Sequence, residues 1–163
     1  MLRFEPDATR RRSIPIAFRA DHGEAHVIER VFFRAMLPDD DDGPTVGNQA
    51  NQLGVRPGVD MKAPMAGPGC GGMSVTADDP TRMYVGVLPE TFGGLNRETI
   101  VFETSAATFD ARSGLAVGRI HPKKLHAVVE ASTDCAIEHF QGLLAKTRPT
   151  WKRAPLPSAE ESR

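Results

Sequence analysis

Apolar and polar positions along the chain predict a fold of short strands joined by many turns. β-branched and aromatic residues gather in short runs that glycine, proline or aspartate interrupt, a pattern typical of strands. These runs predict strands at 14–18, 31–36, 83–88, 99–103, 115–120 and 125–130. Pro15 confines the first strand to a sheet edge, because proline has no N–H for the ladder, and the strand at 31–36 is its candidate partner.

Two segments have a less decided pattern. Between residues 25 and 37, apolar side chains recur at helical spacing, yet most of them are strand-forming types. We favour a strand at 31–36 over a helix. Residues 45–53 are expected to form a short helix that Gly54 ends.

One helix has a clear signature near the C-terminus. Its apolar stripe recurs at i, i+1, i+4, i+7 and i+8, on Ala136, Ile137, Phe140, Leu143 and Leu144. Ser132 or Thr133 is expected to cap its start, and Asp134 favours the positive end of the helix dipole. Pro149 ends the pattern, and Trp151 is expected to pack back on the core.

The chain is expected to fold as a single α+β domain over residues 14–152. A flexible basic arm at 1–13 precedes it, and a disordered tail at 153–163 follows it. A length of 163 residues suffices for one core, and 15 glycines with 13 prolines agree with a turn-rich, strand-leaning fold.

Charge and composition exclude several classes of protein. The net charge of −1 gives no signal for a general nucleic-acid binder. No apolar run approaches the roughly 18 residues that span a membrane, and the N-terminus lacks the apolar region of a Sec-type signal. The two cysteines, Cys70 and Cys135, are not in a C-x-x-C pair and fit free thiols in a reducing compartment. The sequence thus predicts a cytoplasmic site of action without a membrane partner.

The segment from Gly67 to Val75 holds the densest run of glycines. Its spacing fits G-x-G-x-x-G, but no buried strand precedes it and Asp78-Asp79-Pro80 prevents a following helix, so the dinucleotide-binding fingerprint lacks its context. No lysine followed by serine or threonine comes after the glycines, which excludes a P-loop. Ser74 lies where this loop enters a β-prone stretch, a place where binding residues concentrate.

Other candidate chemistry is weaker. His126 and Glu130 share one face of the last predicted strand and reach a common ligand, although a half-exposed polar face is the commoner meaning of such a pattern. Cys135 and His139 stand four residues apart, but two ligands do not make a zinc site, and no metal site is predicted. The acidic segment 39–42 is interpreted as a solvated turn.

Short motifs follow one another in a definite order over residues 31–152. They are Phe33-Arg34 on a strand, Leu53-Gly54-Val55-Arg56 with Asp60-Met61, Gly71-Gly72-Met73-Ser74-Val75, a strand led by His126, and a final helix with Thr147-Arg148 and Trp151. This order resembles the type VI secretion exported toxins with a reduced ADP-ribosyltransferase-like fold, and their bacterial relatives.

The resemblance implies a small split β-sheet core of ADP-ribosyltransferase-like type with few helices and a C-terminal amphipathic helix. It implies NAD⁺ as the bound substrate, delivery by a non-Sec route into the cytoplasm of a target cell, and a cognate immunity protein as partner. The site residues that it implies are catalytic Ser74 and His126, with NAD⁺-binding Arg56, Gly71, Gly72 and Arg34.

These residue types suit the chemistry of NAD⁺. An arginine fork binds a pyrophosphate, a serine hydroxyl holds a ribose or carboxamide, and a histidine orients a ribose hydroxyl or acts as a base. ADP-ribosyltransferases at large also use a glutamate, for which only Glu130 is a geometric candidate. Two alternatives remain open: a non-catalytic binding module of the same fold, and a housekeeping protein of bacterial conflict loci without toxicity.

Overall fold

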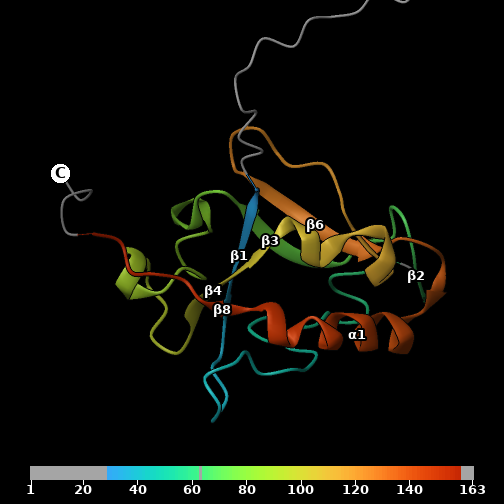
Figure 1. The fold of residues 1–163 in the computed structure, drawn as a ribbon, viewed down its shortest axis with the longest axis horizontal. Helices are drawn as coiled ribbons and strands as arrows, with labels where there is room; N and C mark the ends of the chain where they lie inside the picture. The colour runs from blue at the N-terminus through green and yellow to red at the C-terminus, as the bar shows by residue number, and fades with distance from the viewer. Residues whose placement is uncertain (1–28, 63, 159–163) are drawn as a thin grey trace, which may run out of the picture.

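The computed structural model describes residues 29–62 and 64–158, which form a mixed α+β fold around an antiparallel sheet (Figure 1). Six strands lie in the order β5-β6-β3-β1-β4-β8, and each pairs with its neighbours in antiparallel fashion. Their bounds are β1 Val31–Met36, β3 Met73–Ala77, β4 Ile100–Ser105, β5 Leu115–Val117, β6 His126–Ala131 and β8 Lys152–Arg153. A separate two-stranded ribbon pairs β2 (Met65–Ala66) with β7 (Cys135–Ala136).

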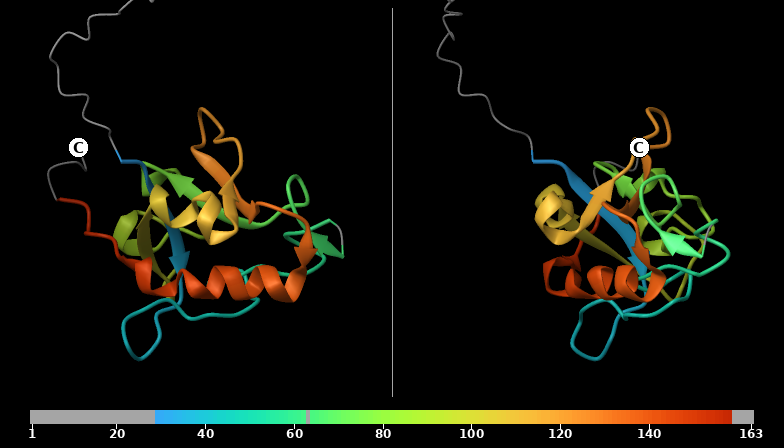
Figure 2. Two further views of the ribbon diagram at one scale, coloured as in Figure 1. Left: turned by 45° about the vertical axis from the view of Figure 1, so that its right-hand side comes forward. Right: turned by 90° about the vertical axis from the view of Figure 1, so that its right-hand side faces the viewer.

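One α-helix, α1 (Ile137–Lys146), lies along one face of the sheet, as the two views of Figure 2 show. Its buried side chains, Phe140 and Leu144, join the main core. Five short 3₁₀ segments complete the described part of the chain: η1 Pro80–Arg82, η2 Glu90–Phe92, η3 Ala106–Phe109, η4 Ala111–Ser113 and η5 Arg148–Thr150.

The sheet has one core face and one partly open face. Along β3, the side chains of Met73, Val75 and Ala77 belong to the main core, so the alternate residues Ser74 and Thr76 point to the other face. On that other face a smaller cluster covers only part of the surface, built from Phe33, Leu88, Phe92, Val101 and Ala154. The remaining part is where a ligand can approach the sheet.

Most of the predicted strands are confirmed. β1 matches the strand expected at 31–36, β4 overlaps the one expected at 99–103, and β6 the one expected at 125–130. β5 ends at Val117, three residues earlier than expected. The strand expected at 14–18 lies outside the described residues, as does the arm at 1–13.

Two predicted elements are wrong. Residues 45–53 form successive turns instead of a helix, because Leu53 N donates across the loop to Thr45 O (2.8 Å) and Leu37 N donates to Asn51 O (2.8 Å). Residues 83–88 form turns instead of a strand, since Val87 N and Leu88 N both donate to the carbonyl of Tyr84. Hydrogen bonds within each loop thus replace the periodic bonds that the apolar pattern indicated.

The predicted cap of the C-terminal helix is also wrong. The N-cap is Ala136, which makes no side-chain hydrogen bond, and the helix begins at Ile137. Ser132 and Thr133 lie too early, because Cys135 and Ala136 first pair with β2 as a strand. The predicted packing of Trp151 is confirmed: it is 4% exposed and its Nε1 donates to Thr147 Oγ1 (3.0 Å).

Ordered structure continues past the boundary expected at residue 153. Arg153 pairs with Phe102 in the sheet, and Ala154 is buried with the smaller cluster, so the segment expected as a tail starts inside the fold. Residues 159–163 lie outside the described part. Within the ranges 29–62 and 64–158, no helix has the length and apolarity to cross a membrane.

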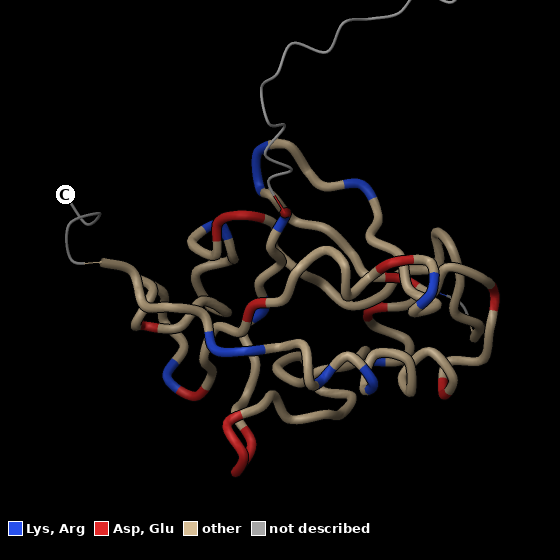
Figure 3. The backbone as a smooth tube through the Cα atoms, in the orientation of Figure 1, with Lys and Arg blue, Asp and Glu red and all other residues tan. Residues whose placement is uncertain are grey.

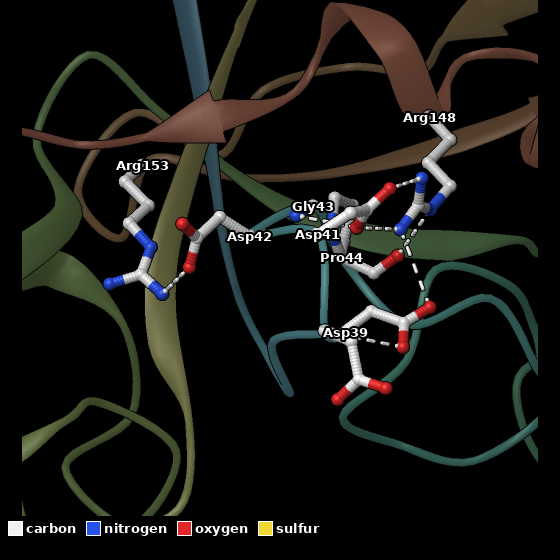
Figure 4. Close-up of polar contacts among 8 residues, drawn as sticks. Asp39, Asp41, Asp42, Gly43, Pro44, Arg148 and Arg153 are labelled. Atoms are coloured by element: carbon white, nitrogen blue, oxygen red, sulfur yellow. Dashed lines mark hydrogen bonds and ion pairs between the residues drawn. The ribbon is translucent and has the colours of Figure 1, made fainter.

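Two arginines that follow α1, Arg148 and Arg153, form ion pairs with the acidic loop at 39–42 (Figure 4). Arg148 donates to the Asp41 carboxylate (Nη1–Oδ2 2.7 Å) and to Pro44 O (2.9 Å), and lies 3.4 Å from Asp39. Arg153 pairs with Asp42 (2.6 Å). The hydrogen bonds of Arg148 hold the pKa of the Asp41 carboxyl at about 2. The loop interpreted as a solvated turn is therefore also a tertiary contact.

Candidate functional site

A cavity of about 700 Å³ opens on the face of the sheet opposite the main core. Residues of β1, β3 and β6 form its floor, and the segments around Tyr84 and Lys124 form its sides. This volume is in the range of cavities that bind small ligands. Three of the predicted site residues, Arg34, Ser74 and His126, line it together.

Strand register explains how these side chains meet. Phe33 on β1 pairs with Thr76 on β3, and Thr76 pairs with His126 on β6, so the three form one row across the floor. Ser74 lies two residues from Thr76 on the same face and is the diagonal neighbour of His126. Such neighbours stand roughly 7–8 Å apart. No hydrogen bond joins Ser74 and His126 among the described residues, and this spacing suits two groups that flank a ligand.

His126 is placed to act as a neutral imidazole. Partial burial lowers its pKa below the ordinary 6.5, and the nearby His121 and Lys124 lower it further. The residue is exposed and lines the cavity. At neutral pH His126 is therefore able to accept a proton or a hydrogen bond from a ligand.

Arg34 lines the cavity while it holds the surrounding backbone. The ladder between β1 and β3 ends beyond Phe33, and from there Arg34 Nη1 donates to Ser74 O (2.6 Å). Nε and Nη2 donate to the carbonyls of Gln52 and Ala50. Burial lowers the pKa of the guanidinium to about 10, so it stays charged at neutral pH. Its first role is to fix the position of Ser74, because its guanidinium is engaged with these backbone carbonyls.

Arg56 is not among the residues that line the cavity. Its guanidinium is engaged with Asp60 through Nη2–Oδ1 (2.7 Å) and Nε–Oδ2 (3.1 Å), and its N–H donates to the same carboxylate (2.7 Å). These bonds raise the pKa of Arg56 and lower that of Asp60. The pair closes the turn from Arg56 to Asp60, whose carbonyl accepts from Gly72 N (3.1 Å), so Arg56 lies beside the glycine segment and outside the cavity.

Gly71 and Gly72 have packing roles. Gly71 adopts a φ of +96° beside the backbone of Asp60, a conformation that favours glycine. At Gly72 a Cβ would overlap the carbonyl oxygen of Val129 on β6. The two glycines let the strand that carries Ser74 approach its neighbours closely, and neither lines the cavity.

Glu130 does not share the cavity with His126, although both residues are on β6. Its Oε2 accepts from Gly69 N (2.9 Å), and it is not among the residues that line the cavity. Cys135 lies on β7 before the helix begins, so it does not share a helical turn with His139. The described residues contain no group of three or more His, Cys, Asp or Glu side chains arranged to hold a metal.

The cavity also contains residues that the sequence patterns did not single out. Four of them are Arg82, Tyr84, His121 and Lys124. With Arg34 and His126 they give the described lining five basic side chains and no acidic one. Figure 3 shows Lys and Arg on the loop between β5 and β6, on the side of the fold opposite the acidic loop. The basic run His-Pro-Lys-Lys at 121–124 is the sequence signal that could have indicated this part of the cavity.

Comparisons of the chain with protein-family models, with curated proteins and with solved structures found no match. The likeness to secreted toxins therefore stays a prediction from the short motifs. The functional argument begins with the geometry and charge of the cavity.

Proposed function

We propose that this chain binds NAD⁺ in the cavity above β3 and β6 and acts on it as an ADP-ribosyltransferase-type enzyme. The observation that carries the proposal is the convergence of Ser74, His126 and Arg34 on one cavity whose described lining is basic. A pyrophosphate brings negative charge, and arginine and lysine are its usual partners. The volume of about 700 Å³ suits a ligand of this size class.

In this proposal each residue of the cavity has a role that follows from its position. Lys124 binds the pyrophosphate together with Arg82, which also lies 3.4 Å from the Asp79 carboxylate. His121 offers its Nε2–H because its Nδ1 accepts from Lys123 N and Lys124 N. Ser74 holds the nicotinamide ribose or carboxamide. In the transfer, the bond between ribose C1′ and the nicotinamide nitrogen breaks, and nicotinamide leaves with the electron pair. The acceptor's nucleophile bonds to C1′ and gives its proton to the neutral His126. Tyr84, which is 76% exposed at the rim, offers a ring face for stacking.

The wider biological role belongs to the same proposal. ADP-ribosylation of an essential cytosolic target would stop its work, and the proposal includes that the chain acts in this way as a toxin in the cytoplasm of a target cell. A cognate immunity protein then protects the producing cell. The proposal also includes the finer fold assignment, an ADP-ribosyltransferase-like arrangement of the antiparallel sheet.

A specific observation favours a second candidate, a non-catalytic binding module. No carboxylate is found among the described residues that line the cavity, and Glu130 is engaged with Gly69. A ribose cation would therefore lack the stabilising glutamate that transferases at large use. Such a module would bind NAD⁺ without releasing nicotinamide.

Bacterial growth during cytosolic induction, with nicotinamide release measured on the purified protein, tests the proposal. We expect growth arrest by the parent protein and its relief in Ser74→Ala and His126→Ala at equal soluble level. Loss of the base in His126→Ala should lower turnover by roughly 10²–10⁴-fold. His139→Ala, an exposed histidine on α1, is the matched control.

The outcomes separate the candidates. NAD⁺ binding without nicotinamide release would favour the binding module. Arrest by the parent and by all variants alike would assign toxicity to protein contacts and remove support from the catalytic role. Healthy growth with folded protein and no NAD⁺ binding would overturn the proposal.

A further inference from the structure

A second, smaller cavity of about 330 Å³ adjoins the first. The two share Ala35, Ala50 and Val87 as lining residues, so they are direct neighbours that meet at these side chains. The carbonyl of Ala50 accepts from Arg34 Nη2 (2.9 Å), which fixes the wall between them. A ligand longer than the first cavity would reach the second by passing over these shared residues.

The chemistry of the second cavity differs from that of the first. Its polar lining consists of three side-chain amides and one hydroxyl, and the described lining carries no charge. The residues are Gln49, Asn51, Asn96 and Thr99. Amide groups both donate and accept hydrogen bonds, as do the edges of a purine and the hydroxyls of a ribose. The second cavity thus suits an uncharged, hydrogen-bonding group and not a phosphate.

Thr99 gives a second and independent indication of a ligand. The residue is only 5% exposed, and its hydroxyl has no hydrogen-bond partner among the described residues. Its backbone is satisfied, since Thr99 N donates to Asn96 Oδ1 (2.9 Å). Buried hydroxyls are nearly always paired, so an unpaired one in a residue that lines a cavity favours a partner from outside the chain, either a water molecule or a ligand group.

The amides have free capacity as well. The Oδ1 of Asn96 already accepts from Glu98 N and Thr99 N, which orients its NH₂ group and leaves that group without a partner in the described part of the chain. The amide of Gln49 makes only a long contact with Asn48 (3.4 Å). These groups are positioned by the loops yet keep donors and acceptors for a ligand.

We infer that the second cavity is the subsite for the adenosine half of NAD⁺, with Thr99 and the neighbouring amides as its specificity-determining residues. The inference rests on the proposed function. The first cavity then holds the nicotinamide ribose beside Ser74 and His126 and the pyrophosphate beside the basic residues. The uncharged remainder of the dinucleotide extends past Ala50 into the amide-lined cavity.

Calorimetric titration of the full chain with two probes tests the subsite. NAD⁺ reaches both cavities, whereas nicotinamide mononucleotide lacks the adenosine half. We expect Thr99→Val to weaken NAD⁺ binding by about 3- to 10-fold, the effect of one neutral hydrogen bond, and to leave nicotinamide mononucleotide binding unchanged. The melting temperature should stay the same or rise, because valine keeps the shape and removes an unpaired hydroxyl.

Two further variants complete the experiment. Gln49→Ala changes an exposed side chain on the opposite wall and should give the same selective loss for NAD⁺ without a folding risk. Thr91→Val, an exposed threonine outside both cavities, is the matched control and should bind both probes normally.

The failure of the subsite can be told from the failure of the proposed function. Unchanged NAD⁺ affinity in Thr99→Val and Gln49→Ala, with the parent chain binding both probes, would overturn the subsite and leave the function standing. Equal weakening of both probes would also overturn the assignment to the adenosine half. No binding of either probe to the parent chain would overturn the proposed function and this inference with it.

Discussion

His126 is the residue whose ionisation decides what the cavity can do. Its folded-state pKa lies below 6.5, first because of partial burial and then because of His121 and Lys124. The unfolded chain therefore binds more protons as the pH falls, so stability is lost on going down through 6.5 towards the folded pKa. The imidazole is neutral at pH 7 and loses its capacity as a base in the same window.

An NMR titration of the His126 ring protons checks this prediction. We expect a midpoint below 6.5 in the parent and a higher midpoint in Lys124→Gln, because that substitution removes one of the charges that disfavour the imidazolium. A midpoint at or above 6.5 in the parent would contradict the assignment of His126 as a neutral base. Turnover, where it is measured, should decline over the same pH range.

Arg34 and Arg56, the two arginines of the motifs, show what the sequence does not predict about a single residue. Arg34 and Arg56 both follow the family-like pattern, and both were expected at the ligand. Only Arg34 lines the cavity, while Arg56 closes a turn on Asp60. A sequence gives the type of each side chain, but the partner that a guanidinium takes depends on which carboxylate or carbonyl the fold brings near.

At the scale of elements, β3 shows that glycine determines how closely strands approach. A methyl group at Gly72 would overlap the carbonyl oxygen of Val129, and a backbone atom cannot move aside without breaking the ladder between β3 and β6. We expect Gly72→Ala to lower the free energy of unfolding by about 1–3 kcal/mol, as overpacking does. It should also displace Ser74 and so weaken ligand binding.

Gly142 provides the opposite control. It is exposed on α1, and a Cβ there would meet nothing within 4 Å. Gly142→Ala should therefore raise the free energy of unfolding by about 0.4–1 kcal/mol, since alanine limits the unfolded chain and favours the helix. Urea unfolding of both variants measures the two changes. Equal effects of the same sign would contradict the assigned role of Gly72.

The elements that sequence patterns predicted correctly are those whose signal is local. β1, β4, β6 and α1 each have an apolar pattern that matches their burial. The segments 45–53 and 83–88 have similar apolar content, but loop hydrogen bonds hold them, and Val85 and Val87 are left nearly half exposed. The conformation of these two segments depends on contacts with other parts of the chain, and the spacing of apolar residues along the sequence carries no information about such contacts.

At the scale of the whole molecule, the acidic loop and the Lys and Arg residues of the loop between β5 and β6 lie on opposite sides of the fold, across its shorter dimension in this view, while residues of both signs are spread over the rest (Figure 3). The near-zero net charge conceals the excess of basic side chains around the cavity and its local positive field. Such a field raises the rate at which an anionic ligand arrives and declines as salt increases. Net charge alone therefore did not reveal the basic lining of the cavity.

The ion pairs between the acidic loop and the C-terminal segment join parts of the chain that are distant in sequence. Asp41 is held ionised by Arg148, so its pKa falls from 3.8 to about 2, and the stabilisation is present above 3.8 and lost as the pH falls through about 2. We expect Asp41→Asn to lower the melting temperature slightly at pH 6, and the difference from the parent to shrink as pH decreases or salt increases.

Asp40→Asn is the control that separates the effect of the Asp41–Arg148 ion pair from the effect of removing one negative charge from the loop. Asp40 lies in the same exposed loop, and within the described chain its carboxylate is not paired with a cation. Thermal melts of the parent and both variants, from pH 6 downward and at low and high salt, make the comparison. Equal shifts for Asp40→Asn and Asp41→Asn would mean that loop charge alone matters. A shift confined to Asp41→Asn would show that Arg148 holds the two ends of the fold together through this carboxylate.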